Sequence, residues 1–285
     1  MIKIKKRRIE YQPIIDTSEK FRIAIERCQG FQNRTEGKKN ILGFSGGKDS
    51  LVTYMALVFS GIDFEPIYSL TSVDPPELVN YIKNIFNPWA KRLGYPVVKF
   101  SKYKKWTRGE NKGKIKTMWS LIANRAIPPT RNVRYCCSDL KENTGEAGDT
   151  VFTGVRWEES KARSQRTMVG FFNRKICVRP IIDWTETEIW SFILENGIPY
   201  CELYDMGWDR LGCIGCPLSS NQKKELAIYP KYKELYIKAF DKMIIYRNRN
   251  GFSDEGWKTG EDVFKWWIGD CEKKRKEIDG QCSMF

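Results

Sequence analysis

The segment that decides the fold is Asn40–Phe59, which reads NILGFSGGKDSLVTYMALVF. Its first part, Asn40–Phe44, is a short apolar run typical of a buried β-strand, and Leu51–Phe59 is an apolar run typical of a helix. Between them lies Ser45–Ser50, a turn with two adjacent glycines. A strand that passes through a glycine turn into a helix favours a parallel α/β sheet.

The same alternation of strands and helices continues along the chain, and the pattern becomes helical from Asn221 onward. We therefore predict an α/β fold with a doubly wound, mostly parallel five-stranded sheet and a helical C-terminal extension. The expected domains are a basic N-terminal extension (1–39), a nucleotide-binding domain (40–220) and the extension (221–285). The four further strands are expected at 64–70, 95–100, 150–155 and 176–182, and the two further helices at 76–93 and 185–196, the second capped by Thr185.

Composition excludes several classes of protein. Lys and Arg number 49 against 35 Asp and Glu, a formal net charge of +14, and there is no histidine, which excludes Ser-His-Asp machinery and His-ligated zinc. No apolar stretch approaches the roughly 18 residues of a membrane span, so we expect a soluble cytoplasmic protein without a membrane partner. Nine cysteines, an odd number, fit reduced thiols and metal ligation better than a disulfide framework.

The glycine turn predicts an anion site. Backbone N–H groups at a strand–helix junction converge on one point, where the helix dipole adds positive potential, and Lys48 adds a mobile charge. The turn is not a Walker A loop, because Leu42 stands where that pattern needs Gly and Asp49 where it needs Ser or Thr. A carboxylate beside a polyphosphate indicates Mg²⁺ at the site. The alternative is an ordinary turn that caps a helix.

Ser45–Ser50 matches the Ser-Gly-Gly-x-Asp-Ser signature of the adenine nucleotide α-hydrolase, or N-type ATP pyrophosphatase (PP-loop), superfamily. Over roughly residues 40 to 220 the chain resembles one branch of it, the phosphoadenosine phosphosulfate (PAPS) reductase family, which includes adenylylsulfate reductases and DNA phosphorothioation enzymes. The other segments that carry this resemblance are Thr71–Glu77, Tyr135–Cys137, Thr153–Arg156 with Ser160 and Arg163, and Gly212–Pro217.

The resemblance implies an adenine nucleotide as ligand, with the loop cradling its phosphates, Gly154 beside the nucleotide and Arg156 facing the anionic substrate. Reductases of the family carry a degenerate loop, whereas this one is intact and resembles the members that cleave ATP between the α and β phosphates. Adenylation with pyrophosphate release is then expected, with Lys48, Asp49, Arg156 and Mg²⁺ at the reacting phosphates. The expected nucleotide-binding residues are Ser45, Gly46, Gly47, Lys48, Asp49, Ser50, Gly154 and Arg156.

Arg163 is a further candidate because Arg forks match phosphate or sulfate geometry, and Arg156 and Arg163 both follow the strand expected at 150–155. The alternative is a solvated helix face on which Glu158 and Glu159 pair with Lys161 and Arg163.

Two cysteine pairs form a candidate metal site. Cys136 and Cys137 are adjacent, and Cys213 and Cys216 form a Cys-x-x-Cys pair. Such pairs bind structural zinc routinely, but adjacent cysteines are unusual in zinc ribbons. The combination resembles the arrangement in adenylylsulfate reductases and some phosphorothioation enzymes, which implies a [4Fe–4S] cluster. Zinc remains the alternative, and buried free thiols are the third interpretation.

Cys282 lies near the C-terminus, where reductases of the family place a nucleophilic cysteine, but their Glu-Cys-Gly-Ile-His ending is absent. We treat Cys282 as a candidate nucleophile, with a spectator thiol as the alternative. Cys28, Cys177 and Cys201 are expected to pack as small apolar side chains.

Basic residues gather in three places: the N-terminus, the segment 101–116 with Trp106, expected to be a mobile loop, and the run Lys273–Lys276. Together they could form a nucleic-acid track, or the charge could simply attract anionic nucleotides. Trp257, Trp266 and Trp267 are expected to be core residues.

Three functional hypotheses follow. The first is a PAPS reductase-like enzyme that adenylates a substrate and assists sulfur transfer from a sulfur donor, with nucleic acid as one acceptor and an iron–sulfur cluster near the site. The second is a reductase that releases sulfite from adenylylsulfate or PAPS and uses a thioredoxin-like reductant. The third is a non-catalytic nucleotide-sensing protein.

Overall fold

A computed structural model describes residues 16–142, 144–252 and 256–270 of the chain. These residues form two units that are interleaved along the sequence, and we call them the sheet unit and the helical unit. The sheet unit takes residues 16–70, 74–102 and 144–212, and the helical unit takes 71–73, 103–142, 213–252 and 256–270.

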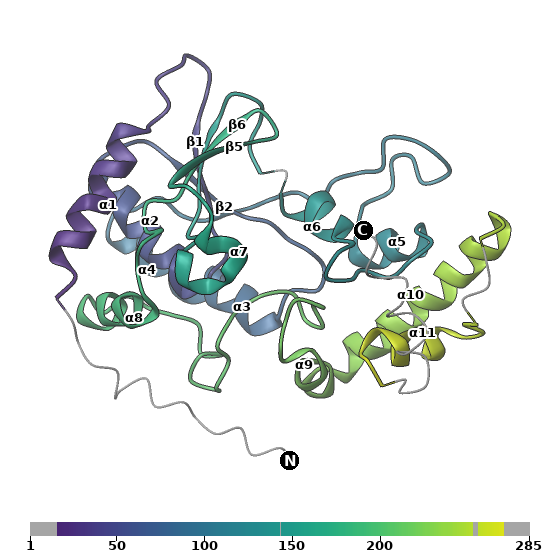
Figure 1. Cartoon of the computed structure of the whole chain (residues 1–285). Helices are drawn as coiled ribbons and strands as arrows, with labels where there is room; N and C mark the ends of the chain where they lie inside the picture. The colour runs from purple at the N-terminus through teal and green to yellow at the C-terminus, as the bar shows by residue number, and fades with distance from the viewer. Residues whose placement is uncertain (1–15, 143, 253–255, 271–285) are drawn as a thin grey trace. The chain divides into compact units, whose positions relative to one another are not determined.

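The sheet unit is built on a sheet (Figure 1). The strands of this sheet follow the order β3-β2-β1-β4-β6-β5. All neighbouring pairs are parallel except β5 with β6, which is antiparallel and places β5 at one edge. The strands are β1 (Asn40–Gly43), β2 (Glu65–Tyr68), β3 (Lys99–Phe100), β4 (Thr150–Phe152), β5 (Val169–Phe172) and β6 (Lys175–Val178).

The strand order reverses between β1 and β4. From β1 the chain adds β2 and β3 on one side, and it then returns to the other side of β1 with β4 and β6. In open parallel sheets, ligands bind beyond the carboxyl ends of the strands at such a reversal. The turns that follow β1 and β4 therefore occupy the place where this architecture puts a ligand site.

Helix α2 is the most buried helix of the sheet unit. Ten of its 13 residues are buried, and it packs against both α1 and α8. A helix covered on several sides is apolar around most of its circumference, which explains the continuous apolar run after the glycine turn. The helices of this unit are α1 (Ser18–Gly30), α2 (Lys48–Ser60), α3 (Pro76–Tyr81), the π-helical turn η2 (Ile82–Phe86), α4 (Asn87–Arg92), the 3₁₀ turn η3 (Trp157–Glu159), α7 (Lys161–Ser164) and α8 (Glu186–Glu195).

The five predicted strands and the mostly parallel sheet are confirmed, and the sheet gains one strand, β5, that the sequence pattern did not indicate. The helix predicted at 76–93 is also present, with η2 inserted between α3 and α4. Thr185 caps α8 as predicted, because its side chain accepts a hydrogen bond from the Glu188 N–H while the Glu188 carboxylate accepts one from the Thr185 N–H.

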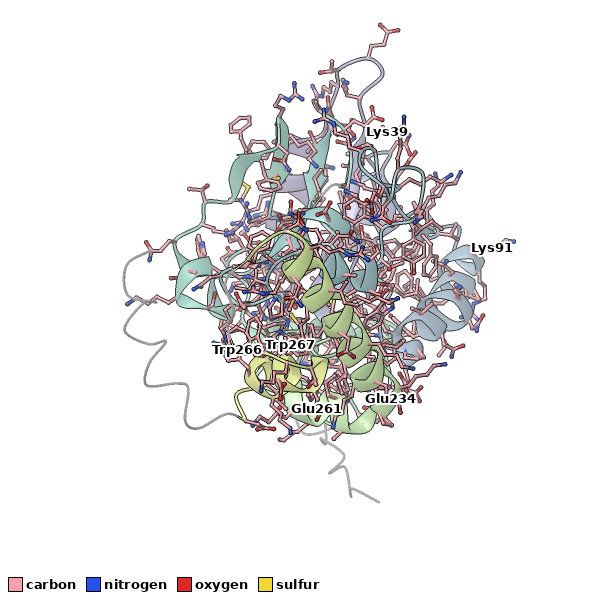
Figure 2. The ribbon with its side chains drawn as sticks, turned by 90° about the vertical axis from the view of Figure 1, so that its right-hand side faces the viewer. Lys39, Lys91, Glu234, Glu261, Trp266 and Trp267 are labelled. Carbon is pink, nitrogen blue, oxygen red and sulfur yellow. The ribbon has the colours of Figure 1, made fainter. Side chains whose placement is uncertain are left out.

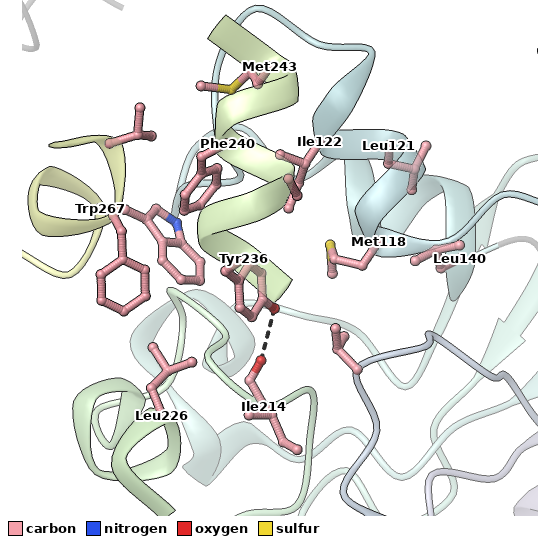
Figure 3. Close-up of a cluster of buried hydrophobic side chains, with 14 residues drawn as sticks. Met118, Leu121, Ile122, Leu140, Ile214, Leu226, Tyr236, Phe240, Met243 and Trp267 are labelled. Atoms are coloured by element: carbon pink, nitrogen blue, oxygen red, sulfur yellow. Dashed lines mark hydrogen bonds between the residues drawn. The ribbon is translucent and has the colours of Figure 1, made fainter. Parts of the chain in front are cut away.

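The helical unit has its own apolar core (Figure 3). Tyr236, Phe240 and Met243 of α10 belong to this cluster together with Met118 of α5, and Trp267 of α11 closes another side of it. The expected helical character of the C-terminal extension is therefore confirmed. The helices are α5 (Met118–Ala123), α6 (Tyr135–Leu140), α9 (Gln222–Ile228), α10 (Pro230–Arg249) and α11 (Gly260–Trp267).

Tryptophans anchor both the C-terminal helices and the basic segment 103–116. Trp266 and Trp267 lie next to each other on α11 (Figure 2). Trp267 is buried and donates a hydrogen bond to the Pro129 carbonyl, while Trp266 packs edge-to-face on Trp257. Trp106 packs against the same core, so its ring serves the interior of this unit. Within the described part of the chain, no helix is both long enough and apolar enough to cross a lipid bilayer.

Candidate functional site

The glycine turn after β1 is held in shape by its own side chains. Gly46 has φ +72°, and a Cβ built on it would lie 2.6 Å from the Leu78 side chain of α3, so glycine is required there. The Ser45 hydroxyl donates to Ser50 Oγ at 3.2 Å, and the Ser50 hydroxyl donates to the Gly47 carbonyl at 2.8 Å. These contacts fix the backbone at the first turn of α2, where unpaired N–H groups attract an anion.

Lys48 is buried and hydrogen-bonded, which corrects the expectation of a mobile charge. Its side chain is 7% exposed, and its ammonium donates to the Asp209 carbonyl at 3.1 Å. The Glu186 carboxylate lies 3.9 Å from the same ammonium. The Lys48 N–H donates to the hydroxyl of Tyr204 at 2.9 Å. The segment after α8 thus covers the start of α2.

Asp49 and Arg156, both predicted from the sequence, meet in the sheet unit. Arg156 Nε donates to Asp49 Oδ1 at 2.6 Å, and its NH1 donates to Glu158 at 2.8 Å and to the Trp184 carbonyl at 2.9 Å. Burial lowers the pKa of the guanidinium, but Asp49 and Glu158 more than compensate and raise it, so Arg156 remains charged. The structure therefore joins the candidate Mg²⁺ ligand to the candidate anion-binding arginine.

Gly154 follows β4 and lies directly against the first turn of α2. A Cβ at this position would be 2.7 Å from the Asp49 carbonyl carbon and 3.0 Å from the Ser50 nitrogen. Because both of those atoms belong to the backbone, neither can move aside easily. The absence of a side chain at Gly154 thus lets the turns after β1 and β4 approach each other.

Arg163 lies on the short helix α7 and pairs with Glu159, four residues earlier. The helix-face pairing considered from the sequence is therefore present. The assignment of Arg163 to substrate binding stays a prediction.

The four cysteines of the candidate metal site all belong to the helical unit. Cys136 and Cys137 lie on α6, and Cys213 and Cys216 lie in the loop before α9. A hydrogen bond from Cys136 lowers the pKa of Cys137, assisted by Arg134. The same hydrogen bond, burial, and the neighbouring Cys213 and Cys216 raise the pKa of Cys136. The four thiols are therefore close enough to affect one another.

Four thiols without carboxylates are a donor set that suits an iron–sulfur cluster or zinc. In the described residues, however, no three Cys, Asp or Glu side chains are arranged to hold a metal ion. The donor chemistry fits such a group, and the assembly of the four ligands around it stays a prediction.

The backbone of the Cys213–Cys216 loop is firmly held. The Tyr236 hydroxyl donates to the Ile214 carbonyl at 2.9 Å (Figure 3), and the Ile214 N–H donates to the Val73 carbonyl at 2.8 Å. The Gly215 N–H donates to the buried carboxylate of Glu225 at 2.9 Å. Gly215 has φ +71°, and a Cβ there would lie 2.9 Å from Leu226.

The sequence profile of the phosphoadenosine phosphosulfate reductase domain matches residues 39–219, well over half of the chain. The chain belongs to this family. The Ser45–Ser50 loop and the four cysteines of the candidate metal site fall inside the matched range, whereas Glu225 and Cys282 lie beyond it.

Curated relatives match parts of the chain. The chain is 31% identical over 222 residues to the uncharacterized protein MJ0973 of Methanocaldococcus jannaschii, which covers 74% of this chain and 48% of that protein. It is 38% identical over 94 residues to the adenosine 5'-phosphosulfate reductase of Oceanobacillus iheyensis, covering 30% of this chain and 38% of the reductase. The chain thus spans about half the length, or less, of these curated relatives.

Among solved structures, the phosphate complex of PAPS reductase from Candida auris is similar, with a TM-score of 0.46 and 16% sequence identity. The similarity covers 67% of this chain and 87% of the reductase chain.

Tyr204 and Glu225 were not predicted from the sequence. Tyr204 lies in an aromatic segment that reads as core, and Glu225 lies in a helix rich in charge, so neither stands out locally. Tyr204 contacts a backbone N–H 156 residues away, and Glu225 contacts the Cys213–Cys216 loop from beyond the range that matches the family profile. Cys282 and residues 1–15 lie outside the described residues, and their assignments stay predictions.

Proposed function

We propose that the chain is an ATP-dependent enzyme of the PAPS reductase family that adenylates a substrate and releases pyrophosphate. The observation that supports this most directly is the position of the intact Ser45–Ser50 loop. It lies after β1 at the strand-order reversal, with Gly154 packed against it from the turn that follows β4. Parallel sheets bind ligands at this point, and the start of a 13-residue helix there favours a phosphate group.

In this proposal the Ser45–Ser50 loop and the two arginines Arg156 and Arg163 have distinct roles. Backbone N–H groups of the Ser45–Ser50 loop that are not already paired within the protein, as those of Gly47, Lys48 and Ser50 are, hold the β and γ phosphates, and Asp49 binds Mg²⁺. Lys48, Arg156 and Arg163 balance the negative charge that develops when a substrate oxygen attacks the α-phosphorus. The bond between the α-phosphorus and the bridging oxygen breaks, and pyrophosphate leaves with that oxygen.

A sulfur nucleophile from a donor would then attack the adenylated substrate and displace AMP, which leaves with the bridging oxygen, and nucleic acid is the acceptor that the charge of +14 favours. Cys136, Cys137, Cys213 and Cys216 would hold a [4Fe–4S] cluster. Such a cluster supplies redox chemistry or a site for sulfur binding. The chain's own contribution is a fixed Cys213–Cys216 loop.

Release of pyrophosphate from ATP tests the proposal. The full-length chain should bind ATP with Mg²⁺ and form pyrophosphate in the presence of an acceptor, or catalyse exchange of labelled pyrophosphate into ATP. Asp49→Asn should weaken the dependence on Mg²⁺. A folded chain that binds no adenine nucleotide by calorimetry would overturn the proposal, and binding without pyrophosphate or sulfite would indicate a nucleotide sensor.

A second candidate activity is favoured by the similarity to adenosine 5'-phosphosulfate reductases over 94 residues. There a cysteine thiolate attacks the sulfur of adenylylsulfate, AMP leaves, and a thioredoxin-like dithiol reduces the resulting thiosulfonate to release sulfite. Cys282 is the candidate nucleophile. Sulfite release that Cys282→Ser abolishes would favour this activity over adenylation.

The metal is tested separately. Anaerobically purified protein should contain close to four iron and four sulfide per chain and absorb broadly in the visible. One equivalent of zinc without colour would favour the zinc alternative.

A further inference from the structure

Tyr204 lies in the segment that follows α8, far in sequence from the glycine turn, yet its hydroxyl reaches that turn. The hydroxyl oxygen accepts a hydrogen bond from the Lys48 N–H at 2.9 Å. A Cβ built on Gly47 would lie 3.3 Å from the same oxygen. The phenol is therefore part of the wall around the N-terminal turn of α2.

The ring of Tyr204 is fixed in place by its neighbours. The residue is 3% exposed, and its ring packs edge-to-face on Trp190 with the centroids 4.9 Å apart. The Lys48 ammonium lies 5.6 Å from the ring centroid and donates to the carbonyl of Asp209, in the same segment. A side chain held this way presents its hydroxyl with little loss of conformational entropy when a ligand binds.

The proton of this hydroxyl is not used within the described part of the chain. Burial raises the pKa of Tyr204 well above its usual value, and the charge of Asp49 raises it further, so the phenol is neutral at physiological pH. A neutral phenol can donate one hydrogen bond while it accepts another. Its oxygen already accepts from Lys48, and among the described residues no acceptor receives its proton.

We propose that Tyr204 is a further phosphate-binding residue, whose hydroxyl donates a hydrogen bond to an oxygen of the pyrophosphate portion of the nucleotide in the Ser45–Ser50 loop. The inference rests on the proposed function, because it assumes that the loop holds a nucleotide. It adds a donor from outside the loop motif. The Tyr204 hydroxyl would thus accept a hydrogen bond from the Lys48 N–H and donate one to the ligand.

The test is calorimetric titration of the full-length chain with Mg²⁺-pyrophosphate, Mg²⁺-ATP and adenosine. Tyr204→Phe removes only the hydroxyl. Because hydrogen bonds to charged groups are strong, the variant should bind pyrophosphate and ATP about 10- to 100-fold more weakly. Adenosine lacks phosphate and should bind as it does to the parent chain, which also shows that the variant is folded.

Tyr200→Phe is the matched control, since Tyr200 lies in the same aromatic group and its hydroxyl donates to Asp205 at 3.2 Å. Its affinity for pyrophosphate should be unchanged. If Tyr204→Phe is unstable, replacement of Tyr204 by 3-fluorotyrosine keeps the ring and strengthens the donor, so pyrophosphate should bind more tightly.

Unchanged or tighter pyrophosphate binding by Tyr204→Phe would overturn the inference, because the hydroxyl would then be neutral or obstructive. An equal loss of adenosine affinity would also overturn it, since the effect would not be specific to phosphate. If the parent chain binds none of these ligands, the proposed function itself fails, and the two failures are thereby distinguished.

Discussion

Gly154 affects both the packing of the sheet unit and the shape of the candidate site, because it lies directly against the backbone of Asp49 and Ser50. Gly154→Ala would place a methyl group 2.7 Å from the Asp49 carbonyl carbon, so α2 or the turn after β4 must shift. We expect a loss of about 2 kcal/mol in the free energy of unfolding and weaker ATP binding. Urea denaturation and calorimetry measure both.

Gly30→Ala is the control for this change, because a Cβ at Gly30 of α1 meets nothing within 4 Å. Alanine there should leave stability unchanged or raise it slightly through helix propensity. Equal effects of the two substitutions would show that the contact between Gly154 and Asp49 is not tight.

Arg156 is the cation that Asp49 and Glu158 share. Arg156→Met removes the cation between Asp49 and Glu158 and leaves the Trp184 carbonyl without this donor. Loss of one partner of a buried ion pair is costly, so we expect a destabilisation of about 3 kcal/mol in urea denaturation. Arg163→Met disrupts a more exposed pair with Glu159 and should cost under about 1 kcal/mol. Comparable losses from both would contradict a buried network around Arg156.

The residues of the glycine turn could be predicted because their chemistry is local. Adjacent glycines, a lysine and an aspartate between a strand and a helix indicate an anion site without knowledge of the remaining fold. Tyr204 could not be predicted this way, because its partner Lys48 is brought to it only by the packing of α2. The packing of α2 also buries the side chain of Lys48. Lys48 is therefore not the mobile charge that the sequence predicts.

Strand β5 was not predicted, because the turn that joins it to β6 lacks the usual sequence signal of a β-hairpin. β5 pairs with β6 across a tight turn at Asn173 and Arg174, with φ of +49° and +59°. Turns of this kind usually carry Asn-Gly, and the arginine in the second position removes that signal. The parallel strands, by contrast, were visible as apolar runs between helices.

Helix α9 holds the Cys213–Cys216 loop through the side chain of Glu225. The Glu225 carboxylate accepts hydrogen bonds from the Gly215 N–H and, at 2.6 Å, from the Ser219 hydroxyl. Glu225→Ala leaves both donors without this partner, so stability should fall by about 2 kcal/mol and metal affinity about 10- to 100-fold. Iron content after anaerobic reconstitution and urea denaturation are the measurements.

Two further variants serve as controls for Glu225→Ala. Glu225→Gln keeps an acceptor for Gly215 and should retain most of the iron. Glu234→Ala changes an exposed glutamate of α10 (Figure 2) and should have no effect on either measurement. Full iron loading of Glu225→Ala would show that the loop does not depend on this carboxylate.

At the scale of the whole molecule, a chain with a net charge of +14 has few carboxylates to neutralise its basic groups, and those that are paired should govern its response to acid. Two of these paired carboxylates form ion pairs between α1 and the region around α8. Arg27 of α1 binds Asp183 at 2.7 Å, and Lys20 binds Glu188 at 2.8 Å. Burial raises the pKa of each carboxyl, but hydrogen bonds and charge from its basic partner outweigh burial and lower it overall.

A carboxyl whose pKa is lower in the folded state stabilises the fold above its unfolded pKa, and this contribution disappears as the pH falls through the folded pKa. The reference values are 3.8 for Asp and 4.5 for Glu, so stability should be constant near neutral pH and decline below about pH 5. Asp183→Asn tests the assignment, with a loss of about 2 kcal/mol at pH 7 that becomes smaller as the pH falls below 3.8 towards the lowered pKa of the folded state, because the parent carboxyl then begins to be protonated as well. Thermal unfolding of both proteins between pH 3 and 7 measures the difference.

Asp16→Asn, which changes an exposed aspartate beside Ser18, is the control and should follow the parent closely. A difference between Asp183→Asn and the parent that stays constant across this range would mean that the amide disturbs packing rather than removing a charge from the pair with Arg27.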